Sequence, residues 1–365
     1  MLLLGAGKSG FAKSASFLIT SQPLSTEVYE GQAATFTVSA IGATSYQWQF
    51  SANDGVNWSN IDGAILSSYT IPSTIRAEDN GKRFRCVVSG SSTTINSNNA
   101  ELSVWNPLAL GNDLGIWFDP TFGLFTERTG SGATTSVVDN GSVGTYRSRN
   151  NINGISYGNN NMPIYRSAGL NGTPCVEFDG VDDAIDLVPD FSSGFRNKES
   201  AYIFSGMSVE EVEGPQRHFF TFASADYSDG LIDMFFEHWP SFFSTRLARL
   251  RTNNPNGGSG YSTQQNSYFT NLQPFVLGIE CLFTGGVSYL RKNGNRVSTS
   301  VGPYSGNSPD INPVWSIIGG IGGGSFDPFK GKLGHMIIAT PSTEFSSSTM
   351  AKIEGFINYK SGLIY

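Results

Sequence analysis

The 365-residue chain has little charge, few cysteines and no basic block. Asp, Glu, Lys and Arg make up only 15% of it, and its net charge is −7. Nucleic-acid binding needs clustered lysine and arginine that neutralise phosphates, so we expect no nucleic-acid partner. The three cysteines, Cys86, Cys175 and Cys281, lie far apart in the sequence and form no C-x-x-C pair. We therefore expect three buried free thiols and no disulfide scaffold.

Long apolar runs are absent as well. No stretch approaches the roughly 20 residues of a membrane-spanning helix, so we expect no membrane partner. Residues 1–4 are far shorter than the apolar region of a secretory signal, which indicates synthesis in a cytoplasm. Turn-forming residues are abundant instead, with 43 glycines beside many Ser, Asn and Thr. This composition predicts many short strands joined by turns, in a chain long enough for two or three domains.

Residues 1–17 form a small, glycine-rich segment that precedes the first strand signals. Its large apolar side chains include Leu2, Leu3, Leu4 and Phe11. An ordered apolar arm without a core of its own needs a surface to lie on. We therefore expect these four residues to anchor the chain in a larger assembly, with a flexible tail as the alternative.

Residues 18–105 carry turn signals at the spacing of a β-sandwich. Residues 33–40 alternate as a half-buried strand, Trp48 lies in the next one, and residues 79–89 contain Phe84-Arg85-Cys86. The segment resembles an immunoglobulin-like domain, with its core tryptophan on the third strand. Val38 stands where that family has the partner cysteine, and Phe84 stands at the tyrosine-corner position. The resemblance therefore implies a free Cys86 packed against Trp48.

Residues 169–187 predict a turn, a strand, a tight turn and a second strand. Asn171-Gly172 and Asp179-Gly180 are turn dipeptides, and residues 175–178 favour a strand. The pattern resembles the early hairpin of concanavalin-A-like (laminin-G-like) jelly-roll domains. A hairpin with Asn293-Gly294 at its tip and strands over 315–320 and 329–338 match the same family.

The C-terminal segment predicts the one clear helix, at about 347–361. Ser346-Ser347-Ser348 offers N-cap hydroxyls, Met350 and Ile353 follow a helical period, and Gly362 stands at the C-cap. The predicted fold class is all-β. It comprises an anchoring arm over 1–17, an immunoglobulin-like sandwich over 18–105, and a concanavalin-A-like jelly roll over 106–365 that ends in this helix.

Catalysis would need paired carboxylates, since the resemblance includes β-glucanases with an E-x-D-x-E strand. The nearest stretch has Asp233 and Glu237 on one strand face, but Leu231 stands at the nucleophile position. The retaining pair of carboxylates is therefore broken. The three histidines are scattered along the chain. We expect a protein that is not an enzyme.

Four aspartates lie close together in the sequence: Asp179, Asp182, Asp183 and Asp186. Hard oxygen ligands on a turn suit calcium. The same residues also form turns by accepting bonds from backbone amides, and we favour this interpretation. We thus predict no cofactor, with calcium on Asp179, Asp182 and Asp183 as the alternative.

Carbohydrate recognition in this fold, as the resemblance implies, uses aromatic platforms with amide or carboxylate hydrogen bonds. The candidate platforms are Trp239, Tyr261, Tyr268 and Tyr304. The sequence by itself does not distinguish them from core positions.

The combination of a short arm, a cysteine-poor immunoglobulin-like domain and a jelly roll resembles tailed-phage virion proteins. That resemblance implies a capsid decoration or a tail or fibre appendage, located in the virion. Its partners would be other virion proteins through the arm, further copies in a homo-oligomer or symmetric shell, and weakly a host-surface glycan. The alternatives are a virion-associated polysaccharide hydrolase or lyase and a bacterial surface adhesin.

Overall fold

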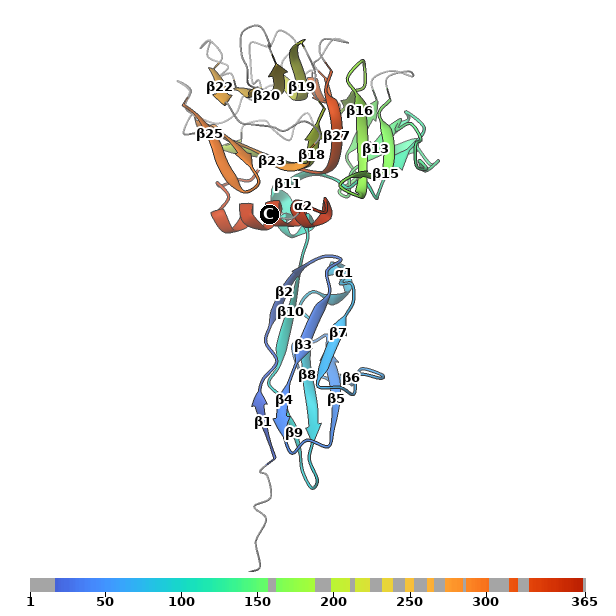
Figure 1. Ribbon diagram of the computed structural model, residues 1–365, viewed down its shortest axis with the longest axis vertical. Coiled ribbons are helices and arrows are strands. Elements are labelled where there is room, and N and C mark those ends of the chain that lie inside the picture. The colour runs from blue at the N-terminus through green and yellow to red at the C-terminus, as the bar shows by residue number, and fades with distance from the viewer. Residues whose placement is uncertain are drawn as a thin grey trace, which may run out of the picture. The chain divides into compact units, whose positions relative to one another are not determined.

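The computed structural model describes residues 17–156, 162–187, 198–210, 214–223, 232–238, 247–252, 261–265, 273–284, 287–301, 315–320 and 328–363. The chain divides into two compact units between Asn106 and Pro107. Figure 1 labels their elements.

The first unit is an immunoglobulin-like β-sandwich. One sheet has the strand order β2 (Thr26–Tyr29), β10 (Ala100–Trp105), β8 (Arg83–Ser89), β5 (Ser45–Ser51) and β6 (Ser59–Asn60), with β9 (Thr94–Asn96) paired to β8. The other layer pairs β1 (Leu18–Ser21) with β4 (Ser39–Ile41), and β3 (Ala34–Thr37) with β7 (Ser68–Ile71). The short helix α1 (Arg76–Asp79) precedes β8. Strands β2 and β10 run parallel, and the other described pairs of this unit are antiparallel.

The core of this unit is built around the tryptophan that the sequence marks. Trp48 and Cys86 are register partners on β5 and β8, and both are fully buried. Val38 joins the same apolar cluster, and the Phe36 and Phe84 rings stack at 4.6 Å. Cys86 is a free thiol as expected, and burial raises its pKa to about 11. The sandwich is therefore held together by packing where a disulfide stands in oxidised relatives of the fold.

The second unit consists of two sheets in which the described strand pairs are antiparallel. The first sheet has the order β15 (Ile164–Leu170), β16 (Thr173–Asp179), β27 (Lys330–Ala339), β18 (Ser200–Val209), β23 (Phe275–Leu282), β24 (Val287–Lys292) and β25 (Asn295–Val301), with β11 (Leu114–Phe118) paired to β27. The second has the order β12 (Leu124–Phe125), β13 (Thr145–Arg147), β14 (Asn153–Ser156), β17 (Ile185–Asp186), β26 (Trp315–Ile318), β19 (Gly214–Ala223), β20 (Ile232–His238), β21 (Leu247–Thr252) and β22 (Tyr261–Gln265). Two 3₁₀ helices, η1 (Pro107–Asp113) and η2 (Gly130–Gly132), complete this unit. This is the predicted concanavalin-A-like jelly roll, and the all-β fold class is confirmed.

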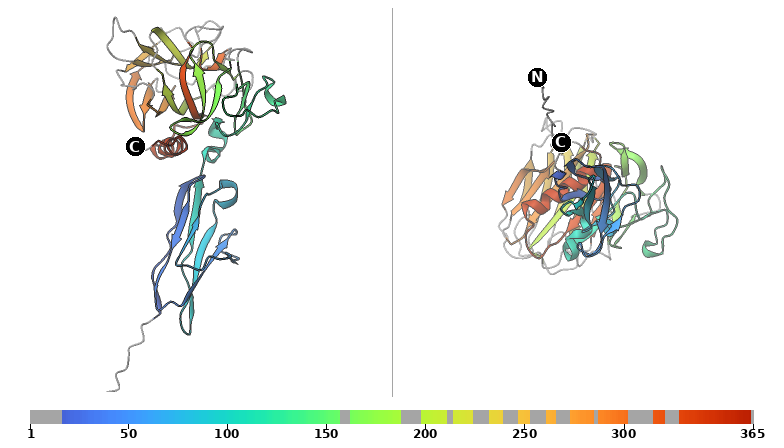
Figure 2. Two further views of the ribbon diagram at one scale, coloured as in Figure 1. Left: turned by 45° about the vertical axis from the view of Figure 1, so that its right-hand side comes forward. Right: turned by 90° about the horizontal axis from the view of Figure 1, so that it is seen from below.

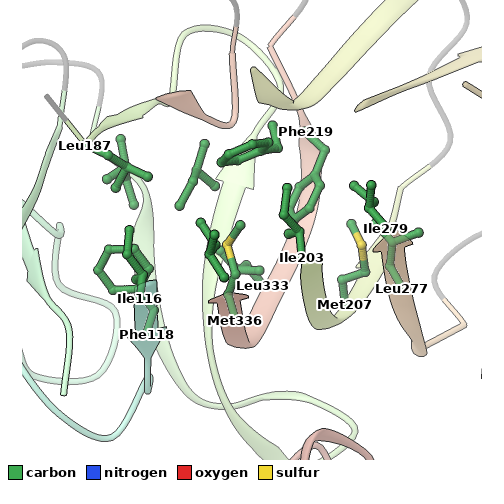
Figure 3. Packing of buried hydrophobic residues seen from close by; sticks show 14 of the residues in the cluster. Ile116, Phe118, Leu187, Ile203, Met207, Phe219, Leu277, Ile279, Leu333 and Met336 are labelled. Atoms are coloured by element: carbon green, nitrogen blue, oxygen red, sulfur yellow. The ribbon is translucent and has the colours of Figure 1, made fainter. Parts of the chain in front are cut away.

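The jelly-roll core lies between the two sheets. Ile203 and Met207 of β18 and Leu333 and Met336 of β27 meet Phe219 of β19 in one apolar cluster (Figure 3). All five side chains are at most 1% exposed. The turns that the sequence predicts are also present. Asn171-Gly172 has φ of 49° and 78°, and Asn293-Gly294 has φ of 50° and 82°, which suits tight hairpin turns.

Helix α2 (Ser347–Lys360) packs against β18, β23 and β27 (Figure 2). The Ser346 hydroxyl accepts a bond from the Thr349 amide at 3.1 Å and caps the helix. Gly362 ends it with a φ of 63°, a conformation in which a side chain would be strained. Neither α-helix of the described chain has both the length and the apolar character needed to cross a membrane.

His335 of β27 is buried against β11 and α2. Trp117 Nε1 donates to His335 Nδ1 at 3.3 Å, so the ring proton lies on Nε2, which is 3.7 Å from Asp119 Oδ1. The Phe356 ring packs edge-on with its centroid 5.8 Å away. Burial lowers the pKa of His335 to about 4, and the nearby Asp119 carboxylate only partly opposes this. The imidazole is therefore neutral at physiological pH.

This burial predicts a stability loss in acid. Unfolded histidine has a pKa of about 6.5, so the unfolded chain binds the proton more tightly than the folded one. Stability from this group is complete above about pH 6.5 and falls as the pH drops toward about 4. Between about pH 7 and about pH 4.5, urea unfolding of the parent should lose about 2–3 kcal/mol more than that of His335→Gln.

The comparison with the His335→Gln variant is needed because Asp183 changes the stability with pH in the opposite direction. Burial raises the pKa of this carboxyl to about 7, so its contribution to stability falls as the pH rises from about 4 to about 7. Subtracting the two pH profiles cancels this effect. Parallel profiles for parent and variant would contradict the assignment to His335.

Candidate functional site

Four charged side chains meet where α2 crosses the jelly-roll sheet, and we call them the Arg291 network: Glu280, Arg291, Arg296 and Glu354. Arg291 donates from Nε and Nη2 to the two oxygens of Glu354, at 2.7 and 2.9 Å. Its Nη1 donates to Glu280 Oε1 at 2.9 Å. Arg296 donates to both oxygens of Glu280, at 3.1 and 2.7 Å. Two guanidinium groups and two carboxylates make the network formally neutral.

The local sequence explains how these groups meet. The Asn293-Gly294 turn makes Arg291 and Arg296 register partners on β24 and β25. Their like charges are tolerated because Glu280, only 1% exposed, binds both. Gly278 lies opposite Arg291, and a Cβ there would come within 3.0 Å of the Arg291 Cβ. Hydrogen bonds from Arg291 to Glu354 raise the pKa of the guanidinium, so it stays charged.

A groove of about 670 Å³ opens beside this network, between α2 and the β24–β25 hairpin. It is lined by Arg291, Asn293, Gly294, Asn295, Arg296, Ser347, Met350, Ala351, Glu354, Gly355 and Asn358. The side chain of Arg296 is 43% exposed, and its guanidinium stacks 3.7 Å from the centroid of the Tyr289 ring. The buried Oδ1 of Asn358 has no hydrogen-bond partner among the described residues. The groove therefore offers amide, hydroxyl and guanidinium groups for hydrogen bonding with no net charge from the network.

The acidic turn after β16 brings together three of the four predicted aspartates. Carboxylate oxygens of Asp179, Asp182 and Asp183 lie within 4.8 Å of one another. Asp183 Oδ2 accepts from the Asp179 amide at 2.8 Å, and Asp179 Oδ1 accepts from the Val181 amide at 2.7 Å. Asp186 lies apart on β17. The donor set suits a hard cation chemically, yet each of these contacts also closes the turn.

The side chains of the predicted glycan platforms lie outside the described part of the chain. Trp239, Tyr268 and Tyr304 lie outside the described residues, and only the backbone of Tyr261 is described, at the start of β22. The arm residues Leu2, Leu3, Leu4 and Phe11 also lie outside the described part. Asp233 and Glu237 lie in β20, of which the structure describes only the backbone.

Sequence reasoning missed the Arg291 network, although two signals for it were present. Glu280 interrupts the otherwise apolar β23, and Glu354 lies among the buried residues of α2. A carboxylate in such a position is rarely buried without a cationic partner. Their partner could not be chosen from the sequence, because Arg291 and Glu354 are 63 residues apart.

Removing one member of the network should destabilise the second unit. Glu354→Ala leaves the Arg291 charge buried and half-paired, so we expect it to lower the free energy of unfolding by about 3–5 kcal/mol. Ser348→Ala changes an exposed side chain on the same helix and should change it by less than about 0.5 kcal/mol. Equal effects of the two variants in guanidinium unfolding would contradict the role of the network.

Chelation distinguishes the two interpretations of the acidic turn. Because backbone amides already satisfy carboxylates of Asp179 and Asp183, EDTA should leave the melting temperature unchanged. Asp179→Ala should still cost about 1 kcal/mol through its lost turn bond. A melting temperature that falls with EDTA and recovers with added Ca²⁺ would establish a calcium site.

Comparison with known proteins finds one matching family model and likenesses to solved structures. Residues 20–106 match a family model described as "Domain of unknown function (DUF8696)". None of the curated proteins matches the chain. Among solved structures, the chain is similar to the CBM40 of the Ruminococcus gnavus IT-sialidase, with 13% identity over 50% of this chain and 96% of that one and a TM-score of 0.40. Domain 4 of the arabinanase AbnA from Geobacillus stearothermophilus is similar at 14% identity over 53% and 81%, with a TM-score of 0.39. A chimeric titin Z1Z2 is similar at 24% identity over 25% and 97%, with a TM-score of 0.19.

Proposed function

We propose that this chain is a structural subunit of a tailed-phage virion, on the capsid or the tail, whose second unit adheres weakly to host-surface glycans. The proposal of glycan adhesion rests on one observation, the neutral, amide-rich groove between α2 and the β24–β25 hairpin. Its volume of about 670 Å³ is within the range of small-molecule sites.

Saccharides present many hydroxyls that both donate and accept hydrogen bonds. Asn293, Asn295 and Asn358 supply amides to the groove, and the partly exposed Arg296 supplies a planar donor held by Glu280 and Tyr289. A site with these groups and no aromatic ring in its lining favours weak binding. Many copies on one particle would convert weak single contacts into firm attachment.

The virion part is supported by the sequence, with its apolar N-terminal arm and its resemblance to phage structural proteins. The role is adhesive and not catalytic, since Leu231 breaks the glucanase pattern around Asp233 and Glu237. Low charge and the absence of basic blocks agree with a protein that contacts other proteins and neutral surfaces.

The proposal is tested first on purified particles and then on the isolated chain. Quantitative mass spectrometry should find this chain at a copy number that matches a capsid or tail symmetry, and its absence from particles would overturn the virion role. The full chain, displayed multivalently, should then be retained by some members of a glycan panel that includes sialyllactose and arabinotriose.

Two variants on α2 locate the binding. Ala351→Arg places a long side chain in the groove and should weaken glycan retention at least about tenfold. Ser348→Arg adds the same side chain outside the lining residues and should leave retention unchanged. Equal loss in both, or no retained glycan, would contradict adhesion through this groove, and release of reducing sugars would favour the hydrolase.

A further inference from the structure

Strand β7 is an edge strand of the first unit. Strand β7 pairs with β3, and no strand within residues 17–106 pairs with its other edge (Figure 1). Residues 61–67 pass from the β5–β6 side of the sandwich directly to β7, without forming a strand between. An edge of this kind offers unpaired backbone groups to an added strand.

An apolar pocket opens between the sheets beside this edge. It has a volume of about 160 Å³ and is lined mainly by Phe50, Ile61, Tyr69, Ile71 and Phe84. The ion pair of Asp79 and Lys82, 3.0 Å apart, also contributes to its wall. The space suits one aliphatic side chain from an added strand.

Apolar side chains also flank the start of β7. Ile65 and Leu66 are 60% and 68% exposed, just before the first residue of β7. The backbone there is held in place, because Trp48 Nε1 donates to the Leu66 carbonyl at 3.0 Å. The free edge therefore runs from an exposed apolar pair to an open apolar pocket.

The charged residues around the pocket beside β7 indicate which segment could cover it. Asp62 and Glu78 are exposed and adjoin the lining residues Ile61 and Asp79 in sequence, and the cation in the lining, Lys82, is already paired with Asp79. Residues 1–16 contain no acidic residue, two lysines (Lys8 and Lys13) and the apolar run 2–4. The arm therefore complements the surface in charge and in apolar character.

The place where the arm joins the first unit favours a neighbouring copy. The Phe17 ring packs against Gly90, which follows the last residue of β8, whereas the pocket residue Phe84 lies near the first residue of β8. The seven residues of β8 separate the two points by about 20 Å. Because β1 and β2 run from the Gly90 end of β8 toward its Phe84 end, the arm would have to reverse direction at Phe17 to reach the pocket of its own unit. Sixteen extended residues reach about 50 Å, which is enough to extend to another copy without that reversal.

From these observations we propose that the β7 edge of one copy receives residues 2–11 of a neighbouring copy as an added strand, with a leucine of residues 2–4 in the pocket. Main-chain bonds to β7 would supply affinity, and the pocket would set the register. The inference does not depend on glycan binding by the second unit.

Directed crosslinking of full-length chains tests the proposal. A Gly5→Cys copy and a differently tagged Thr70→Cys copy, when mixed and oxidised, should form a disulfide-linked heterodimer. The native thiols do not compete, because they are buried and burial raises the pKa of Cys175 and Cys281 to about 12. Ser21→Cys, on the edge strand β1 of the same layer, serves as the control and should give at most about a tenth of the yield.

The outcomes separate the possible occupants. Equal yields from Thr70→Cys and Ser21→Cys would overturn the proposal. A Gly5→Cys/Thr70→Cys double variant that links only within one chain would show self-insertion and would overturn the neighbouring-copy arrangement.

A charge placed in the arm provides a second measurement. Leu3→Asp should weaken self-association of the full chain at least about tenfold in sedimentation, because a carboxylate cannot enter the apolar pocket. Ser9→Asp adds the same charge outside the apolar run and should weaken it much less. Equal effects would show that the pocket does not bind the leucines.

Discussion

The structure of the second unit depends on pairing three buried charges, Glu280, Arg291 and Glu354, which the partly exposed Arg296 completes to a neutral set. Glu280 and Arg291 are buried in the sheet, and each would be costly without the other. Glu354 completes the set from α2, so the helix can dock only in the position that brings its carboxylate to Arg291. The same contacts determine how the β24–β25 hairpin lies beside the helix, and thereby the shape of the groove. A neutral, hydrogen-bonding surface follows directly from the pairing requirement.

Around this network, α2 is held by ordinary packing. Met350, Ile353, Phe356 and Ile357 are buried, and Phe356 meets His335 and Trp117 on the sheet. His335 stays neutral there because Trp117 donates to it and burial disfavours its charge. The helix thus covers both an apolar and a polar part of the sheet, and the groove lies beside the polar part.

The two units offer surfaces of different chemistry. The groove of the second unit presents amides and a guanidinium, which suit hydroxyl-rich ligands, whereas the β7 edge of the first presents backbone groups and an apolar pocket. This division corresponds to the two proposals, self-association through the first unit and glycan adhesion through the second. Burial keeps all three thiols unreactive.

Local signals in the sequence and the family resemblances they support were enough to predict the fold class and much of the local structure. Asn171-Gly172 and Asn293-Gly294 specify their turns because few other residues accept positive φ, and Ser346 and Gly362 mark the ends of α2 for equally local reasons. Trp48 and Cys86 could be paired because the resemblance to immunoglobulin-like domains implies that they share one core. The Arg291 network, in contrast, exists only through contacts between distant segments of the folded chain. Its members come from three strands and a helix, and charge pairing between distant segments leaves no periodic signal in a single sequence. The same holds for the acidic turn. Its aspartates could be identified from the sequence, but the burial that raises the pKa of Asp183 depends on how the two sheets pack around it.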